Sequence, residues 1–193
     1  MAADSDTFCR ALGVTVTPGV LSYRTRVGCL PVSIFLMKAP DVARMLHGNY
    51  LDLGLTGDEW LMETGVPPDR RCFETRSYEA SVCLLMAEAD PRPSCGIRSV
   101  VTPYPNLAGS LLREIAPDAE ILNVSGSSEA LVPGIADACL DVVETGTSAA
   151  LNGLMIRESF ERVTTHLVRS GACDQLAAVS VINLLADARR LVR

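Results

Sequence analysis

The chain has 193 residues, a formal net charge of −6, 48% hydrophobic residues and a mean hydropathy of +0.24. An acidic chain without a basic stripe argues against nucleic-acid binding, because phosphate backbones are bound by basic surfaces. No apolar run approaches the ~18 residues that cross a bilayer, and the polar start Met-Ala-Ala-Asp-Ser-Asp is no export signal. We therefore expect a soluble cytoplasmic protein that binds neither nucleic acid nor membrane.

The first half of the chain alternates between helical and strand-like segments. We predict a helix over residues 4–12, a strand over 32–37, a helix over 41–46, a strand over 51–55 and a helix over 56–62. Pro40 stands in the first turn of its helix, where the missing N–H costs nothing, and Gly48 ends that helix. Strand and helix in quick alternation are typical of a parallel sheet.

The second half continues this alternation. We predict strands over residues 80–87, 97–102, 120–124, 138–143 and 154–156, and helices over 106–115, 127–132, 147–152 and 173–191, with weak alternation over 160–168. Composition shifts at 65–71 and near 157–158 indicate crossings between lobes. We therefore predict an α/β protein of two lobes with a ligand in the cleft between them. Residues 1–77 and 158–193 form lobe I, and 78–157 form lobe II.

The cysteines and histidines give no sign of a metal site. The seven cysteines are odd in number and show no C-x-x-C spacing, and Cys83 and Cys139 have apolar neighbours. We expect buried, reduced thiols rather than disulfides or metal ligands. Neither His47 nor His166 has a cysteine or carboxylate at ligand spacing, so we expect both to be structural.

The strongest functional pattern is Cys-Leu-Asp-Val-Val-Glu-Thr-Gly-Thr-Ser, residues 139–148. An apolar strand carries Asp141 toward its C-terminal end, and a turn formed by Thr145, Gly146, Thr147 and Ser148 then opens a helix. Unpaired N–H groups, the helix dipole and three hydroxyls favour a bound phosphate there. Asp141 and Glu144 are suited to ribose hydroxyls or to Mg²⁺ on a pyrophosphate. The alternative is an ordinary strand–turn–helix in which Thr145 or Thr147 caps the helix.

Two further turns follow the same strand-then-helix design. They are Asp-Leu-Gly-Leu-Thr-Gly-Asp at residues 52–58 and Ser-Gly-Ser-Ser-Glu at residues 125–129. Each is weak alone, but three such loops in one short chain indicate a cleft lined with amides for a polyanionic ligand.

Together these segments resemble the catalytic core of the short form of ATP phosphoribosyltransferase, the first enzyme of histidine biosynthesis. The resemblance spans about residues 35–154, and its ordered matches are residues 38–42, 52–58, 102–106, 125–129 and 135–154. It implies a two-lobed fold like the type II periplasmic binding proteins, with mixed, mainly parallel sheets. It also implies transfer of phosphoribose from phosphoribosyl pyrophosphate to N1 of ATP or a related acceptor, with Mg²⁺ as cofactor.

The resemblance also implies roles for particular residues. Glu144, Thr145, Gly146, Thr147 and Ser148 are expected to hold the 5′-phosphate, with Asp141 near the ribose. Asp141 and Glu144 are expected to meet Mg²⁺ through the pyrophosphate. Residues expected near the nucleotide or acceptor are Lys38, Thr56, Gly57, Asp58, Tyr104 and Glu129. The expected assembly is a homo- or hetero-oligomer, in which a regulatory subunit resembling a histidyl-tRNA synthetase is a candidate partner.

The chain departs from the family's pattern where cations are expected. The family's first strand ends in a Pro-Lys-Gly-Arg-like segment that has no counterpart in residues 1–25, and Pro103 stands where the family has Lys before Tyr-Pro. We therefore expect poor transfer to ATP by this chain alone. The alternatives are a non-catalytic, ligand-binding or regulatory relative, and a periplasmic-binding-like enzyme or sensor for another substrate.

Overall fold

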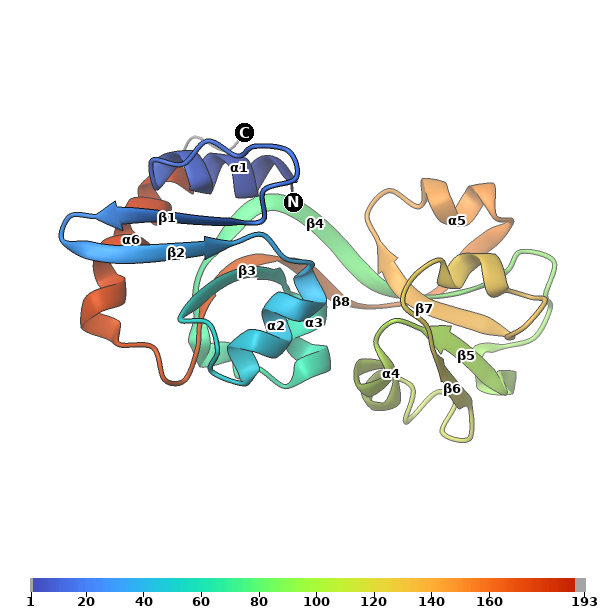
Figure 1. Ribbon diagram of the computed structural model, residues 1–193. Helices are drawn as coiled ribbons and strands as arrows, with labels where there is room; N and C mark the ends of the chain where they lie inside the picture. Colours follow the sequence, from blue (N-terminus) through green and yellow to red (C-terminus); the bar gives the residue numbers. More distant parts are fainter. Residues whose placement is uncertain (1, 190–193) are drawn as a thin grey trace. The chain divides into compact units, whose positions relative to one another are not determined.

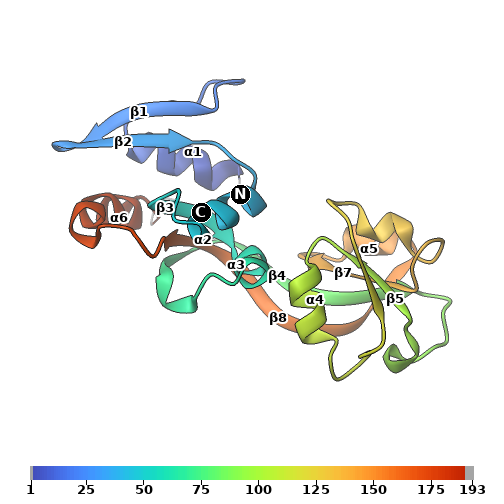
Figure 2. The same ribbon diagram turned by 60° about the horizontal axis from the view of Figure 1, so that its bottom comes forward.

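The computed structural model describes residues 2–189 (Figures 1 and 2). The chain forms two compact units: unit 1 is Met1–Tyr78 with Thr164–Arg193, and unit 2 is Glu79–Val163. The sequence-based boundaries lay at 77–78 and 157–158. Among the described residues, no helix has the length and apolar character needed to cross a membrane.

Unit 1 contains a two-stranded sheet, one end of a six-stranded sheet that continues into unit 2, and four α-helices. Its elements are α1 (Ala2–Ala11), β1 (Ser22–Val27), β2 (Leu30–Phe35), α2 (Ala39–His47), β3 (Leu53–Gly57), α3 (Asp58–Thr64), the 3₁₀ turn η1 (Pro68–Arg70), the first part of β4 (Arg71–Ala87), the last part of β8 (Leu154–Arg169) and α6 (Gln175–Arg189). β1 and β2 form an antiparallel hairpin, and β3 pairs antiparallel with β8.

The hairpin β1–β2 is an element that the sequence patterns did not predict in full. Val27 pairs with Leu30, so Gly28 and Cys29 make the two-residue turn, and Gly28 has the positive φ of +61° that such a turn needs. Exposed and half-buried residues alternate along both strands. β1 was missed because its half-buried positions are mostly not strongly apolar and its exposed positions include two arginines.

The core of unit 1 forms where helices cover the strands. Phe8 of α1, Leu167 of β8 and Val181 and Leu185 of α6 make one buried cluster. A second cluster joins Val42 and Leu46 of α2 to Leu61, Val66 and Val168. Pro40 lies in the first turn of α2, as predicted. The helix ends at His47, directly before Gly48, as its pattern indicated. His47 therefore lies at a helix end and His166 within a strand.

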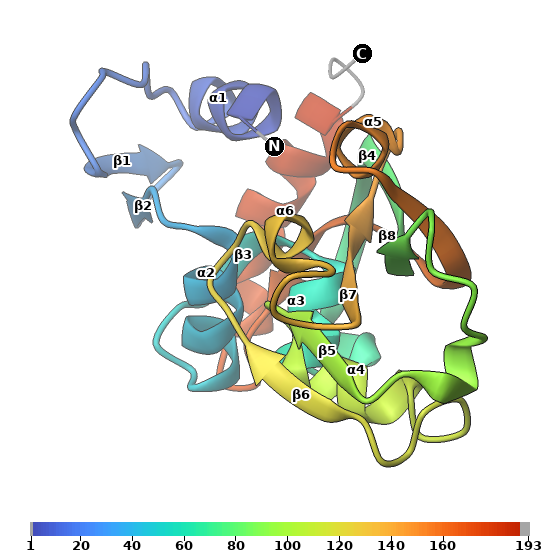
Figure 3. The same cartoon turned by 90° about the vertical axis from the view of Figure 1, so that its right-hand side faces the viewer.

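Unit 2 contains the larger part of the six-stranded sheet, with short helical segments around it (Figure 3). Its elements are the second part of β4, η2 (Ser94–Gly96), β5 (Ser99–Thr102), α4 (Pro105–Leu111), β6 (Glu120–Asn123), η3 (Ser128–Leu131), β7 (Ala138–Val143), α5 (Thr147–Leu151) and the first part of β8. The strand order of the whole sheet is β3-β8-β4-β7-β5-β6, in which β5 runs parallel to β6 and β7, and β4 antiparallel to β7. Leu85, Val101, Cys139 and Ala149 pack together in its core.

The long strands β4 and β8 extend well beyond the predicted segments 80–87 and 154–156. β8 has 16 residues, and its residues 157–162 are mostly polar and include no buried side chain. Polar stretches of this kind become strands because neighbouring strands satisfy their backbone groups, and a local pattern does not contain that information. All seven cysteines are free, as predicted, although Cys29 and Cys95 are exposed and Cys72 is only half-buried.

Candidate functional site

The sheet of unit 2 gathers three predicted segments at one edge. β5, β6 and β7 are parallel, so their carboxyl ends lie at the same edge of the sheet. Tyr104 and α4 follow β5, the 125–129 loop follows β6, and the 144–148 loop follows β7. Ligands of open α/β sheets bind outside the carboxyl ends of the strands. This edge is therefore the candidate site.

Two side-chain hydrogen bonds tie the 125–129 loop to β7 and to the 144–148 loop that follows it. The hydroxyl of Ser128, which is fully buried, donates to Oδ2 of Asp141. The hydroxyl of Ser148 donates to Oε2 of Glu129. Residues 125–129 and 141–148 thus form one connected structure, as the clustering of similar loops in the sequence indicated. The third loop of that group, residues 52–58, belongs to unit 1.

The 144–148 loop leads into α5 without a side-chain cap. Gly146 is left-handed, with φ +73° and ψ 0°, and it occupies the N-cap position of α5 without a side-chain cap. The alternative in which Thr145 or Thr147 is the N-cap is therefore wrong. The hydroxyls of Thr145 and Thr147 lie 3.0 Å apart, and both residues are exposed together with Glu144 and Ser148. The N–H of Thr147 donates to the Thr145 hydroxyl at 3.5 Å, so these exposed side chains lie at the first turn of α5, after the carboxyl end of β7.

Asp141 is half-buried where β7 emerges from the core. Its Oδ1 accepts the N–H of Val142 at 2.8 Å, and its Oδ2 accepts the bond from Ser128. Burial raises the pKa of Asp141, and the nearby charge of Glu129 adds to the rise against the opposing effect of these hydrogen bonds. The same surroundings raise the pKa of Cys139 to about 12, chiefly through burial. The thiol nearest the site is therefore not a nucleophile at neutral pH.

We expect Asp141→Asn to raise the Tm of the protein by a few degrees at neutral pH. A carboxyl whose folded pKa is raised favours folding fully only below its unfolded pKa of about 4, and that contribution is lost as the pH rises through the raised pKa. The asparagine side chain of this variant is uncharged, so the variant avoids this loss of stability, and its amide still pairs with Ser128 and Val142. Thermal melts of both proteins from pH 4 to 8 measure the effect.

Glu144→Gln is the matched control, because this carboxylate lies on the same loop but is exposed. Its Tm should equal that of the wild type across the same pH range. A gain in Asp141→Asn that persists undiminished at pH 4 would assign the effect to packing and contradict the prediction.

Tyr104 and the predicted acceptor residues of unit 1 are mostly engaged in structural contacts. Tyr104 is 6% exposed, and its N–H donates to the Thr102 hydroxyl at 3.0 Å. Thr56 is fully buried, and its hydroxyl donates to the carbonyl of Ala39 at 3.1 Å. Lys38 is exposed and adopts an extended conformation directly before α2.

Gly57 is needed for close packing at the start of α3. A Cβ at this position would lie 2.2 Å from the carboxylate oxygens of Glu59, which is only 4% exposed. A side chain at Gly57 would therefore displace a buried charged group. Packing therefore explains the glycine at position 57, in addition to the predicted approach of a ligand to its backbone.

Asp58 is the centre of a buried polar network that sequence reasoning missed. Both Nε and Nη2 of Arg71 lie 2.8 Å from its Oδ1, the N–H of Thr164 donates to Oδ2 at 3.1 Å, and Nδ1 of His166 lies 3.2 Å from Oδ1. Burial by itself would raise the pKa of Asp58. Hydrogen bonding to His166 and Thr164 and the charge of Arg71 outweigh burial, so the pKa is lowered. No local pattern links these residues, because three different elements bring them together.

Comparison with known protein families identifies the chain's relatives. The model of the ATP phosphoribosyltransferase family matches residues 38–188. The ATP phosphoribosyltransferase of Listeria monocytogenes serotype 4b is 31% identical over 167 residues, covering 84% of this chain and 76% of the relative. That of Clostridium botulinum strain Okra is 26% identical, covering 84% and 77%.

Solved structures agree with the predicted fold class. The HisG:HisZ complex of ATP phosphoribosyl transferase from Thermotoga maritima contains a chain similar at a TM-score of 0.84 and 20% identity, covering 98% of this chain and 93% of that one. The arginine-bound ArgBP from Thermotoga maritima is similar at 0.62 and 12% identity, covering 100% and 84%. The prediction of an α/β fold like that of the type II periplasmic binding proteins is confirmed.

Proposed function

The chain belongs to the ATP phosphoribosyltransferase family, and we propose that its unit 2 binds phosphoribosyl pyrophosphate through Asp141 and Glu144–Ser148. It is a phosphoribosyltransferase of histidine biosynthesis, as the sequence predicted. The transferred group joins N1 of ATP in that reaction. We place this step in the cytoplasm, where the sequence analysis expected the protein.

One observation carries the assignment of the loop. Residues 125–129 and 141–148 are joined by the Ser128–Asp141 and Ser148–Glu129 hydrogen bonds, while Thr145, Thr147 and Ser148 remain exposed where α5 begins. A loop held by a second loop is preorganised, so little ordering is needed when a phosphate binds. N–H groups at a strand-to-helix turn favour an anion. The arrangement supports a 5′-phosphate on residues 145–148 and a ribose beside Asp141.

The carboxylates at this edge fit a metal ion that arrives with its substrate. Mg²⁺ is usually held by one or two carboxylates together with substrate phosphates and water. Across residues 2–189 there is no group of three or more His, Cys, Asp or Glu side chains that could hold a metal ion by itself. Glu144 is exposed, whereas both oxygens of Asp141 already accept hydrogen bonds. We propose that Glu144 would hold Mg²⁺ on the pyrophosphate, with Asp141 supporting the charge balance, and that a bound metal would supply neutralisation of the leaving group's charge.

For the acceptor, we propose that Lys38 contacts the nucleotide directly and that the other predicted residues hold the surrounding loops in place. Lys38 is exposed and supplies a cation for the nucleotide phosphates. Glu129 orients Ser148 through its hydrogen bond. Thr56, Gly57, Asp58 and Tyr104 shape the acceptor-side loops through their structural contacts. Adenine N1 is already nucleophilic, so alignment and charge stabilisation supply most of the rate.

We further propose that the protein works with a regulatory partner subunit. The similar chain from Thermotoga maritima was solved in a HisG:HisZ complex. By this similarity, a subunit resembling a histidyl-tRNA synthetase is the candidate partner here. Co-purification of the two proteins is the direct measurement of their assembly.

We expect binding of phosphoribosyl pyrophosphate to depend on Mg²⁺, because two carboxylates and a pyrophosphate otherwise repel at the same edge. Calorimetry with Mg²⁺ should show one site, and EDTA or Asp141→Asn should weaken it by about tenfold or more, the loss of about 1.4 kcal/mol. Formation of phosphoribosyl-ATP, followed by ultraviolet absorbance, tests the reaction itself. An affinity unchanged by EDTA would remove the carboxylates and the metal from the proposal.

A further inference from the structure

Ser128 is a buried polar residue beside the candidate site that the sequence patterns did not single out. It is the first residue of η3 and is fully buried, whereas Ser125 and Ser127 of the same loop are exposed. Ser127 has a positive φ of +54°, an uncommon conformation for a residue with a side chain. A buried hydroxyl without a hydrogen bond is costly, so the partner of Ser128 indicates what the residue does.

The partner of Ser128 is the carboxylate of Asp141. The Ser128 hydroxyl donates to Oδ2 of this carboxylate, and the N–H of Val142 donates to Oδ1 at 2.8 Å. A carboxylate that is bonded at both oxygens has little freedom to rotate, because a rotation breaks one of the two bonds. Each oxygen has two lone pairs, so each keeps one for a further donor. Asp141, which is only half-buried, is thus held in one orientation with acceptor positions left for a ligand.

Two acceptor positions on one fixed carboxylate suit a pair of neighbouring hydroxyls. Ribose carries such a pair at C2 and C3 on the same face of its ring, whereas 2-deoxyribose carries only the hydroxyl at C3. Hydrogen bonds to an ionised acceptor are stronger than those between neutral groups. The C2 hydroxyl should therefore add to the affinity, provided that the carboxylate stays in the orientation that accepts both hydroxyls together.

The next residue of η3, Glu129, holds the other part of the candidate site. Its Oε2 accepts a hydrogen bond from the hydroxyl of Ser148 in the first turn of α5. Ser128 and Glu129 are consecutive, so their side chains fix Asp141 and Ser148 relative to each other. A ligand that carries a phosphate and a hydroxyl pair at a fixed separation fits such a rigid arrangement with little cost of ordering.

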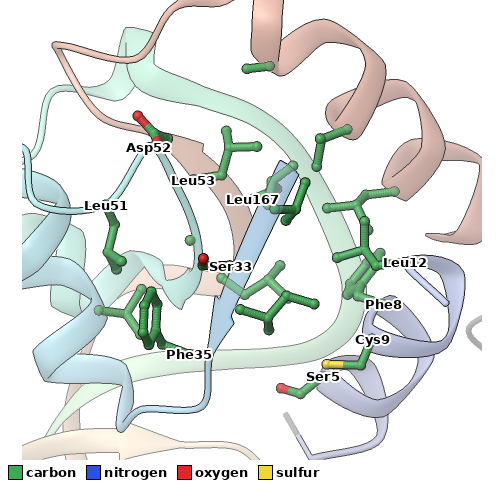
Figure 4. A pocket seen from close by; sticks show the side chains of 18 of the residues that line it. Ser5, Phe8, Cys9, Leu12, Ser33, Phe35, Leu51, Asp52, Leu53 and Leu167 are labelled. Atoms are coloured by element: carbon green, nitrogen blue, oxygen red, sulfur yellow. The ribbon is translucent and has the colours of Figure 1, made fainter. Parts of the chain in front are cut away.

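A second hollow lies in unit 1, but its lining does not suit a sugar phosphate. This groove has a volume of about 710 Å³ and is lined mainly by apolar side chains (Figure 4). Its charged lining residues are Asp6, Asp52 and Asp174, which are all acidic and repel a phosphate. We therefore expect a sugar phosphate to bind to unit 2, where Ser128 and Asp141 lie.

We propose that Ser128 is the positioning residue that makes the site specific for ribose over 2-deoxyribose. Its hydroxyl holds the Asp141 carboxylate in the orientation that accepts the C2 and C3 hydroxyls together. Without this bond the carboxylate rotates and accepts them less well. This inference rests on the proposed function, in which residues 145–148 hold the 5′-phosphate and Asp141 lies beside the ribose.

The test measures how well ribose 5-phosphate and 2-deoxyribose 5-phosphate displace phosphoribosyl pyrophosphate from the full chain, by calorimetry with Mg²⁺. The wild type is expected to bind ribose 5-phosphate about tenfold more tightly than the deoxy sugar, the effect of one hydrogen bond to a charged group. In Ser128→Ala this ratio should fall to about two or less, because the carboxylate is no longer held. Ser128→Cys, whose thiol is of similar size but donates only weakly, should lose most of the preference as well.

Ser99→Ala is the matched control, because it removes another hydrogen-bonded hydroxyl from the sheet of unit 2. Ser99 begins β5, at the opposite end of this strand from the candidate site, and its hydroxyl accepts the N–H of Asp137 at 3.0 Å. This variant should keep the wild-type ratio between the two sugars. Thermal melts of all variants show whether each is folded.

Several outcomes would overturn the inference while leaving the proposed function intact. One is a wild type that binds phosphoribosyl pyrophosphate but prefers neither sugar. Another is a Ser128→Ala protein that keeps the wild-type ratio, or that loses affinity for both sugars equally, since either result makes Ser128 merely structural. A ratio that falls equally in Ser99→Ala would assign the effect to a general loosening of unit 2. A wild type that does not bind phosphoribosyl pyrophosphate would instead contradict the proposed function itself.

Discussion

Replacing Gly146 by proline is expected to abolish measurable binding of phosphoribosyl pyrophosphate. Gly146 has φ +73°, whereas proline is fixed near −65°. The turn must therefore rearrange, and the N–H groups of Thr147 and Ser148 at the start of α5 are displaced. Hydrogen bonds to a charged phosphate contribute about 1.5–3 kcal/mol each, so the loss of two corresponds to a hundredfold or greater fall in affinity. Calorimetry with Mg²⁺ measures it.

A pair of alanine variants separates loop geometry from general strain. Gly153 has a similar φ of +65°, lies just after α5 and has no atom within 4 Å of an added Cβ. Alanine at Gly146 or Gly153 imposes a similar backbone cost of about 1 kcal/mol. We expect Gly146→Ala to weaken binding several-fold and Gly153→Ala to leave it unchanged. Binding by Gly146→Pro at the wild-type affinity would show that the phosphate lies elsewhere.

Replacing Asp58 by alanine is expected to destabilise the protein by about 2 to 3 kcal/mol. The change leaves the Arg71 guanidinium, which is only 24% exposed, and the N–H of Thr164 without their carboxylate. Breaking a buried ion pair costs about 3–5 kcal/mol, and the partial exposure of Arg71 reduces this figure. Urea unfolding measures the change directly, and the Tm should fall by about 4 to 12 °C.

The pH dependence of this loss follows from the lowered pKa of Asp58. A carboxyl with a lowered folded pKa stabilises the protein above its unfolded pKa of about 4, and this contribution is lost as the pH falls through the folded value. The difference between wild type and Asp58→Ala should therefore be full at neutral pH and shrink in acid.

Asp41→Ala is the matched control for Asp58→Ala, because it removes a carboxylate from a surface pair. Asp41 and Arg44 lie 3.1 Å apart, but their side chains are 45% and 63% exposed. Exposed pairs contribute at most about 1 kcal/mol, so this variant should remain close to the wild type. Equal stabilities of Asp58→Ala and Asp41→Ala would show that the Asp58 network is not needed for folding.

Short windows of sequence determined the local structure around the candidate site. β7 and the start of α5 agree with their predicted positions, because an apolar run, a Gly turn and hydroxyl residues each act over a few residues. The first turn of α2 was predicted for the same reason, since Pro40 restricts its own backbone. The family and its reaction were recognised from motifs of this kind, which is why they did not depend on the tertiary structure.

The tertiary structure alone decided which side chains meet. The position of η3 beside β7 brings Ser128 to Asp141, and the pairing of β3 with β8 brings Asp58 near Thr164 and His166. The full lengths of β4 and β8 were also decided there, because their polar residues are held by neighbouring strands. These contacts join residues far apart in the chain, and their stability comes from burial and hydrogen bonding that exist only after the sheet has formed.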